Sequence, residues 1–240
     1  MTARQSIRAS SRRTYFRPAT FRFLRGLEKH NDRAWFNARK PDYIAHVRTP
    51  MLELIADLAA PLATISPHFV ADARVQGGSM FRIYRDVRFT HDKRPYKEWI
   101  SFRLCHERTR ELAGDTPCFY LHVQPRACFV GAGVWRPRRE RLVLIRDYLV
   151  NNPASWQQAT RSAEFTREFR FGGEALKRAP LGFDPTHELI DDLRRRDFVV
   201  HGALTEDQLM APGLVELLIT RFRQLAPMVD WLCGALDLDF

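Results

Sequence analysis

Four stretches in the middle of the chain alternate apolar and polar side chains at every second residue, the spacing of a strand with one buried face. They cover residues 81–89, 99–104, 119–124 and 128–135. The link between the last two, Gln124-Pro125-Arg126-Ala127, is short enough for a hairpin turn. The pattern predicts an antiparallel meander of about four to six strands with one face on the core.

Apolar residues at helical spacing lie before and after these stretches. A helix is expected from Pro18, and a second one after Asn31 or Asp32, because either side chain suits the N-cap position. Thr49-Pro50 reads as the cap of a third helix. Helices, then a sheet, then helices indicate an α+β fold. The later elements expected are helices over 138–150, from Asn152-Pro153, over 187–196 and from Pro212, and a short strand over 198–200.

No change of composition marks a domain boundary in the 240 residues. Hydrophobic residues make up 45% of the chain, so a sizeable core is expected. We therefore predict a single α+β domain over residues 18–240. Residues 1–17 are basic and rich in Ser, and they are expected to form a flexible tail without the apolar region of a secretory signal.

The four cysteines show no C-x-x-C spacing, so a zinc site is not expected. Cys105, Cys118, Cys128 and Cys233 are predicted to be buried, reduced thiols of a cytoplasmic protein. No run of about 18 apolar residues occurs, so no membrane partner is predicted. Phosphate-loop, dinucleotide, nucleophile-elbow and H-E-x-x-H motifs are also missing, so no cofactor and no metal are predicted. The oligomeric state stays open.

Residues 79–99 concentrate basic and aromatic side chains where a strand is expected to run into a loop. Guanidinium and ammonium groups in such a setting are suited to binding an anion. The net charge of +10 likewise favours anionic partners such as nucleic acid, phosphorylated metabolites or acidic protein surfaces.

If the four stretches form one sheet, its face away from the core collects polar and aromatic side chains. These are Arg82, Tyr84, Asp86, Arg88, Trp99, Ser101, Arg103, Tyr120, His122, Gln124 and Trp135. Gly131 and Gly133 fall on the same face and leave room for a ligand, or for another backbone, to approach. The expected result is an aromatic-walled concavity.

The function predicted from this face is the binding of a small phosphate- or carboxylate-bearing ligand. Arg82, Arg88 and Lys97 would hold the anion, and Tyr84 and Trp135 would form walls. The full set of residues predicted to bind it is Arg82, Tyr84, Asp86, Arg88, Lys93, Lys97, Arg103, His122 and Trp135.

A purely structural interpretation competes with this one. Exposed faces of antiparallel sheets are normally polar, and opposed charges pair across strands. Arg82, Asp86 and Arg88 would then pair with one another, and Lys93 and Lys97 would be ordinary surface charges. If helices covered this face instead, the same groups would form buried structural pairs.

Two further functional hypotheses remain. Nucleic-acid binding would use the net positive charge, the basic tail and two arginine clusters, Arg136-Pro137-Arg138-Arg139 and Arg194-Arg195-Arg196, provided that they share a surface. An enzyme would use His122 as a general acid or base, oriented by a carboxylate such as Asp86. A metal cluster of His91, Asp92 and His122 has no support in their spacing.

Several motifs together carry a resemblance to a known family. They are FRFLRGLEKHNDRAWFNARKPDY at 21–43, GGSMFRIYRDVRFTHDKRPYK at 77–97, YLHVQPRACFVGAGVWRP at 120–137 and KRAPLGFDPTH at 177–187. The chain from about Phe21 onward resembles the bacterial and fungal conserved hypothetical family catalogued as domain of unknown function 2461. The resemblance implies a single full-length domain, and it carries over no activity and no catalytic residue.

Overall fold

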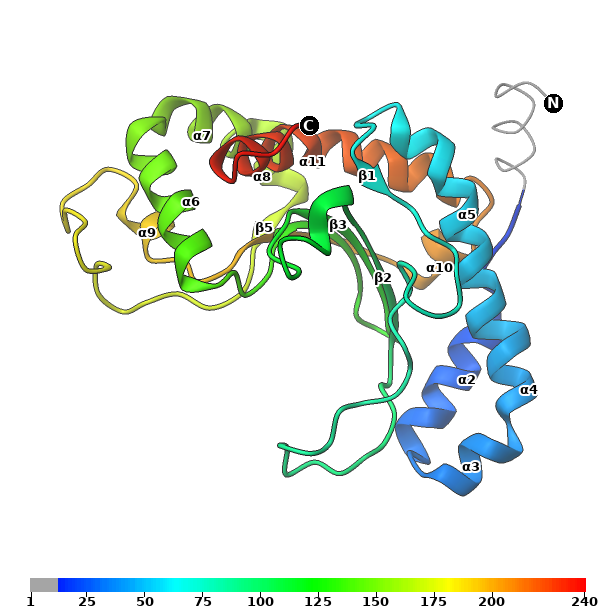
Figure 1. Cartoon of the computed structure of the whole chain (residues 1–240). Coiled ribbons are helices and arrows are strands. Elements are labelled where there is room, and N and C mark those ends of the chain that lie inside the picture. Colours follow the sequence, from blue (N-terminus) through cyan, green and yellow to red (C-terminus); the bar gives the residue numbers. More distant parts are fainter. Residues whose placement is uncertain (1–12) are drawn as a thin grey trace.

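A computed structural model of the chain describes residues 13–240. It shows an α+β fold in which N-terminal helices and a long C-terminal helix pack on a six-stranded antiparallel sheet (Figure 1). The strands are β1 (Phe69–Val70), β2 (Ile100–His106), β3 (Cys118–Val123), β4 (Cys128–Val134), β5 (Arg170–Phe171) and β6 (Phe198–Leu204). The fold class and the strand number predicted from the sequence are confirmed.

Helices occupy most of the remaining described chain. The N-terminal ones are α2 (Pro18–Lys29), α3 (Arg33–Ala38), α4 (Lys40–Tyr43), the π-helical η1 (Ile44–Arg48) and α5 (Thr49–Ala63). Those after the start of the sheet are the 3-10 turn η2 (Glu107–Thr109), α6 (Arg139–Asn151), α7 (Pro153–Thr160), α8 (Ala163–Glu168), α9 (Ile190–Leu193), α10 (Glu206–Met210) and α11 (Leu214–Ala235). Within residues 13–240, no helix is long and apolar enough to cross a membrane.

The strand order is β1-β2-β3-β4-β6-β5, and every neighbouring pair is antiparallel. The predicted hairpin joins β3 to β4, with the N–H of Ala127 bonded to the carbonyl of Gln124 at 3.0 Å. Arg126 takes the left-handed conformation in this turn (φ 68°). β6 pairs along the whole of β4, so a strand from far along the chain lies between β4 and the edge strand β5.

One face of the sheet is buried under helices. Alternate residues of β2, β3 and β4, such as Phe102, Phe119 and Val130, are fully buried there. α11 crosses this face, and Phe222 from it lies with its ring centroid 4.9 Å from that of Phe119. Figure 1 shows α11, α7 and α8 gathered on this side of the sheet, which leaves the opposite face to form a site.

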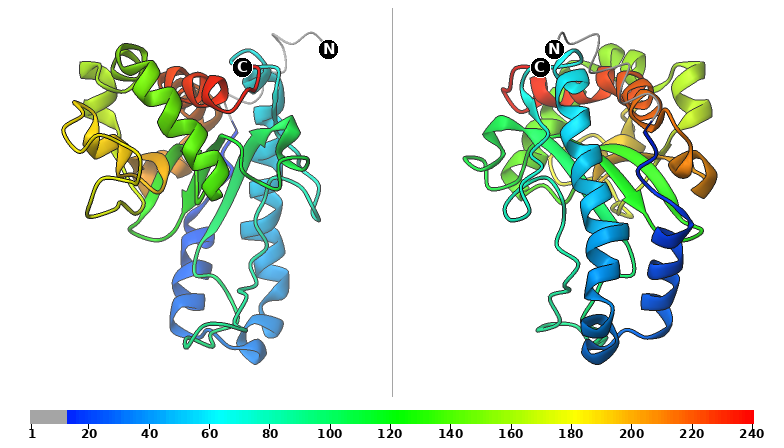
Figure 2. Two further views of the ribbon diagram at one scale, coloured as in Figure 1. Left: turned by 60° about the vertical axis from the view of Figure 1, so that its left-hand side comes forward. Right: turned by 90° about the vertical axis from the view of Figure 1, so that its right-hand side faces the viewer.

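The N-terminal helices confirm one predicted cap and correct another. Asp32 caps α3 by accepting the N–H of Trp35 at 2.8 Å. Thr49 caps nothing, because the chain is already helical there: α4, η1 and α5 follow one another as a single rod (Figure 2). Pro50 cannot bond the carbonyl of His46, which instead accepts the hydroxyl of Thr20 at 2.7 Å. A π-helical turn accommodates the proline ring.

Residues 81–89 do not form a strand, contrary to the prediction from their alternation. Together with their neighbours they form an extension, residues 79–99, which we call the arm; it folds back on itself beyond the end of the sheet (Figure 1). Asp86 and Asp92 each accept the backbone N–H two residues further on, that of Arg88 at 3.2 Å and that of Arg94 at 3.1 Å. Such local bonds compete with the ladder of a sheet.

The end of the predicted tail and one predicted helix also differ from expectation. Residues 1–12 of that tail lie outside the described residues, whereas Tyr15 and Phe16 are buried in the core, so the packed chain begins before Pro18. The helix predicted over 187–196 is limited to the single turn α9. Its continuation pairs with another loop: Leu176 N–H bonds the carbonyl of Arg194 at 2.7 Å. The short strand expected over 198–200 extends to Leu204.

Candidate functional site

The face of the sheet away from the helices carries three rows of side chains that cross β2, β3, β4 and β6 in register. They follow from the strand pairing and the alternation of side chains between faces. The rows are Ser101–His122–Phe129–Ala203, Arg103–Tyr120–Gly131–His201 and Cys105–Cys118–Gly133–Val199.

A groove of about 530 Å³ lies on this face, a volume typical of small-ligand sites. We call it the sheet groove. It is lined mainly by aromatic side chains and glycines: Phe81, Trp99, Arg103, Gly114, Thr116, Cys118, Tyr120, His122, Phe129, Gly131, Ala132, Gly133, Trp135, Gly172, Gly173, Val199, Val200 and His201. The concave, aromatic-walled face predicted from the sequence is therefore present.

The aromatic wall is continuous across β3 and β4. The ring of His122 stacks on that of Phe129 at a centroid distance of 4.7 Å. Tyr120 lies 5.7 Å from Phe129, and Trp99 lies 5.7 Å from His122. These rings give one end of the groove an aromatic surface on which a planar ligand can stack.

The charge in the sheet groove is positive. Among the residues that the structure describes, Arg103 is the one Arg, Lys, Asp or Glu that lines it. The guanidinium carbon of Arg103 lies 5.4 Å from the ring centroid of Phe81, and Nζ of Lys97 lies 5.2 Å from the same centroid. Burial lowers the pKa of Lys97, whose ammonium donates to the carbonyl of Arg82 at 3.0 Å. Two cations therefore meet around one ring at the edge of the groove.

Gly131 and Gly133 allow β6 to approach β4 closely. A Cβ at position 131 would lie 2.5 Å from the carbonyl oxygen of Val200, and one at position 133 would lie 1.9 Å from that of Phe198. Gly133 also has a φ of 130°. Of the two partners predicted for these glycines, the structure shows the neighbouring backbone. At these two positions the floor of the sheet groove therefore carries no side chain.

His122 sits in a short chain of hydrogen bonds. Nδ1 lies 3.1 Å from the hydroxyl of Tyr120, and Nε2 lies 3.0 Å from Oε1 of Gln124. Because Oε1 only accepts, this chain suits a neutral ring with its proton on Nε2. Burial lowers the pKa of His122, which also favours the neutral ring.

We expect this histidine to make stability depend on pH. The unfolded chain takes up a proton at His122 below about pH 6.5, whereas the folded protein resists it because the folded pKa is lowered. The unfolded state then binds more protons, so the free energy of unfolding falls as pH falls through this range. Urea unfolding between about pH 7.5 and about pH 5.5 should show a shallower decline in His122→Phe than in the wild type. The exposed His91→Phe is the control, and equal slopes in all three proteins would contradict the expectation.

The predicted partner of His122 lies elsewhere. Asp86 is on the arm, where its carboxylate bonds the guanidinium of Arg88, with Oδ2 2.7 Å from Nη2. This hydrogen bond lowers the pKa of Asp86 to about 2. His122 has Tyr120 and Gln124 as its ring partners instead, so the structure does not assemble the His122–Asp86 pair that an enzyme was predicted to use.

The arm residues predicted to bind the anion do not line the sheet groove. Arg82 is exposed, and Arg88 pairs with Asp86 as the structural interpretation expected. Lys93 donates to the carbonyl of Val87 at 3.0 Å. Tyr84 lies 5.4 Å, between ring centroids, from Tyr96. The predicted residues that do line the groove are Arg103, His122 and Trp135.

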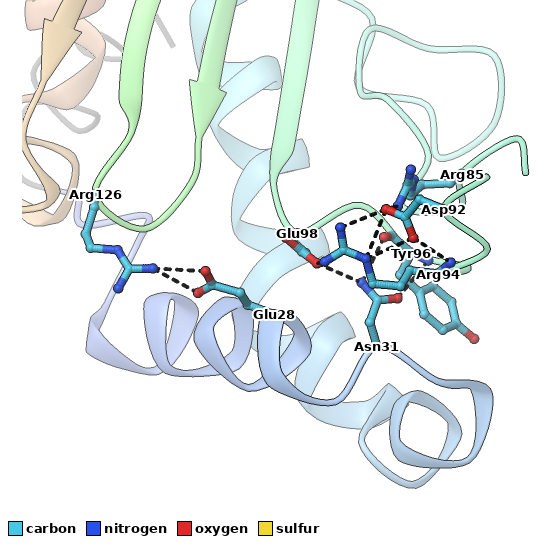
Figure 3. A network of polar contacts seen from close by, with 8 residues as sticks. All are labelled: Glu28, Asn31, Arg85, Asp92, Arg94, Tyr96, Glu98 and Arg126. Atoms are coloured by element: carbon cyan, nitrogen blue, oxygen red, sulfur yellow. Dashed lines mark hydrogen bonds and ion pairs between the residues drawn. The ribbon is translucent and has the colours of Figure 1, made fainter. Parts of the chain in front are cut away.

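The arm is held to the N-terminal helices by a polar network (Figure 3). The side-chain amide of Asn31 both donates to the carbonyl of Tyr96 and accepts its N–H, each at 3.0 Å. Asp92 bonds Arg85 at 2.6 Å and Arg94 at 2.7 Å, and Arg94 also pairs with Glu98. Three arginines of the arm, Arg85, Arg88 and Arg94, thus serve mainly to fix it, because carboxylates of the arm itself already pair with them.

Several lining residues were not predicted as part of the site. Phe81, Phe129 and His201 are the clearest cases. For His201 the signal was readable: Phe198, Val200, Gly202 and Leu204 are buried and alternate with His201 and its neighbours. What the sequence could not show is that this strand pairs with β4, more than sixty residues away along the chain.

The two predicted arginine clusters do meet, in a hollow of about 460 Å³ lined in part by Arg136, Arg139 and Arg196. Acidic side chains share that hollow. Glu174 pairs with Arg196 at 2.9 Å, and the buried Asp197 accepts the N–H groups of Arg136 and Glu174 at 2.7 and 2.8 Å. Much of the positive charge expected for nucleic acid is therefore compensated.

The cysteine prediction is half wrong. Cys128 and Cys233 are free and buried, as expected. Cys105 and Cys118, however, form a disulfide between β2 and β3. They face each other directly in the register, and the neighbouring pair His106–Pro117 makes the ladder bond, so the two side chains lie in a close, non-hydrogen-bonded pair. The spacing in the sequence gave no sign of this pairing.

No group of three or more His, Cys, Asp or Glu side chains is placed to hold a metal ion within residues 13–240. The cluster considered from His91, Asp92 and His122 is not assembled, because Asp92 is bonded to Arg85 and Arg94 on the arm.

Comparison with known proteins gives a family and nothing more specific. No curated protein and no solved structure matches the chain. The model of one family, described as conserved hypothetical protein (DUF2461), matches residues 19–231. Since that match spans the helices, the sheet and the groove together, the chain belongs to the DUF2461 family.

Proposed function

We propose that the sheet groove binds a small phosphate- or carboxylate-bearing ligand with a flat apolar body. One observation carries this proposal: an aromatic-walled groove presents Arg103 and, among the described residues, no Asp or Glu in its lining. An arginine fork without a carboxylate partner is suited to bidentate bonding of a carboxylate or phosphate. Arg103 thus replaces Arg82, Arg88 and Lys97 as the residue that holds the anion.

The spacing of the middle row sets the size of the ligand. Arg103 and His201 stand on β2 and β6, three strand spacings apart, which is about 14 Å between their backbones. Tyr120 and Gly131 lie between them, so the ring of Tyr120 stands beside a position that has no side chain. An anion at Arg103 would therefore place a ring-sized body over Tyr120 and Gly131.

We expect a ligand of this kind to raise the melting temperature, and Arg103→Ala to weaken its binding about ten-fold or more. The screen uses aromatic carboxylates, mononucleotides, sugar phosphates and inorganic phosphate, each followed by titration. Arg88→Ala is the matched control, because it removes the same group from an exposed position on the arm.

Two results would contradict the proposal. One is a ligand whose affinity is the same in wild type and Arg103→Ala. The other is a loss of affinity in Arg88→Ala that equals the loss in Arg103→Ala, because Arg88 does not line the sheet groove.

Single-stranded nucleic acid is the second candidate, and one observation favours it. Tyr120, His122 and Phe129 lie side by side on the open face of an antiparallel sheet, an arrangement on which bases stack in other folds. A thermal shift with short single-stranded oligonucleotides, lost on raising the salt concentration and on Phe129→Ala, would support it. A shift with mononucleotides alone would support the small ligand.

We retain the cytoplasmic location predicted from the sequence as part of the proposal. Cell fractionation checks it. The disulfide does not conflict with this location if the bond is in exchange with cellular thiols, because disulfides of cytosolic proteins are usually transient or redox-sensing.

A further inference from the structure

The disulfide lies at one end of the sheet groove, and its two cysteines differ in exposure. Cys118 lines the groove and is partly exposed. Cys105 is 7% exposed and does not line it. A molecule bound in the groove therefore meets the side chain of Cys118 and not that of Cys105.

In the direction that disulfide chemistry needs, no side chain of the neighbouring strand stands beside Cys118. A thiolate attacks a disulfide sulfur from the side opposite to the sulfur that leaves. Along the row from Cys105 through Cys118, the next position across the sheet is Gly133, which has no side chain. The groove lining at this end also includes Gly114, Gly172 and Gly173.

We propose that the Cys105–Cys118 disulfide is a thiol-exchange site, at which a small anionic thiol enters the sheet groove and bonds to Cys118. The sulfur of the incoming thiolate forms a bond to Sγ of Cys118 while the bond between Cys118 and Cys105 breaks. Cys105 leaves as a thiolate and takes a proton from solvent. The step exchanges one disulfide for another, so no outside oxidant or reductant is needed.

The preference for an anion rests on the proposed function of the groove. Arg103 stands opposite Tyr120, and Tyr120 is two residues from Cys118 on the same strand. Arg103 and Cys118 are therefore diagonal neighbours across the strand pair, about 7–8 Å apart. Within the described part of the chain, no carboxylate in the groove lining opposes it. The other thiols do not compete, because burial raises the pKa of Cys128 to about 11 and that of Cys233 to about 12.

The site is tested with two variants that both lack the disulfide, Cys105→Ser and Cys118→Ser. Each is treated with glutathione disulfide, quenched in acid and analysed by peptide mass. We expect Cys118 in the first variant to gain one glutathionyl group at least ten times faster than Cys105 in the second. Equal rates at the two positions, or no adduct at Cys118, would overturn the proposal.

The charge preference is tested on the oxidised wild-type protein. Reduced glutathione, which is anionic, and cysteamine, which is cationic, are compared for the rate of adduct formation at Cys118. Arg103→Ala should slow the glutathione reaction about five-fold and leave the cysteamine reaction unslowed. An equal effect on both thiols would overturn the role of Arg103. The rates of adduct formation test thiol exchange, whereas thermal shifts with thiol-free anions test the proposed function. The two proposals can therefore fail independently of each other.

Discussion

Gly133→Ala is expected to lower the free energy of unfolding by about 4 kcal/mol or more, or to prevent folding. The added Cβ would lie 1.9 Å from the carbonyl oxygen of Phe198 and 2.8 Å from Cα of Val199. Both atoms belong to the backbone of β6, which is paired with β4 over its whole length and has no freedom to move aside. Urea unfolding with matched slopes measures the loss.

A second glycine separates the steric clash from the strain of the backbone angle. Gly182 has a φ of 88°, and a Cβ built there meets no atom within 4 Å. Gly182→Ala therefore carries only the positive-φ penalty, about 1–2 kcal/mol. If Gly133→Ala cost no more than Gly182→Ala, the close approach of β6 to β4 would not be what requires glycine at position 133.

The central strands were predictable because apolar and polar residues alternate along them just as the buried and open faces of the sheet do. In β2, β3 and β4, each apolar residue of the alternation is buried under the helices, and each intervening residue lies on the opposite face, which carries the sheet groove. Their order along the chain is also their order in the sheet, so no long-range information was needed. The concave face, with Arg103, His122 and Trp135 on it, followed directly.

The arm shows where the same reasoning fails. It has the alternation of a strand, but Asp precedes Arg by two residues at Asp86-Val87-Arg88 and again at Asp92-Lys93-Arg94. Each Asp bonds both the backbone and the guanidinium of its Arg. The anion site was predicted on the arm because arginines are dense there. The position of each Asp two residues before an Arg is equally visible in the sequence, and it indicates that these arginines are already paired.

The disulfide links the fold to the proposed chemistry. It joins β2 to β3 where the groove ends, so the same bond that ties the two strands together offers Cys118 to the groove. Breaking it by exchange would release a cross-link from the folded protein. A redox reaction at this site would thus be measurable as a change in stability.

We expect reduction of the Cys105–Cys118 bond to lower the free energy of unfolding by about 3 kcal/mol. The two cysteines are separated by 13 positions in the sequence, and a cross-link closing a loop of that size restricts the unfolded chain by about this amount. The measurement is urea unfolding of wild-type protein with and without a phosphine reductant.

The double variant Cys105→Ala/Cys118→Ala should unfold at the same urea concentration in both conditions, and Cys128→Ala should keep the wild-type difference. A wild-type midpoint unaffected by reductant, while mass analysis shows four free thiols, would mean that β2 and β3 hold the groove without the bond. This measurement gives the contribution of the disulfide to the free energy of unfolding without any ligand. It therefore also sets the largest change in stability that thiol exchange at Cys118 can cause.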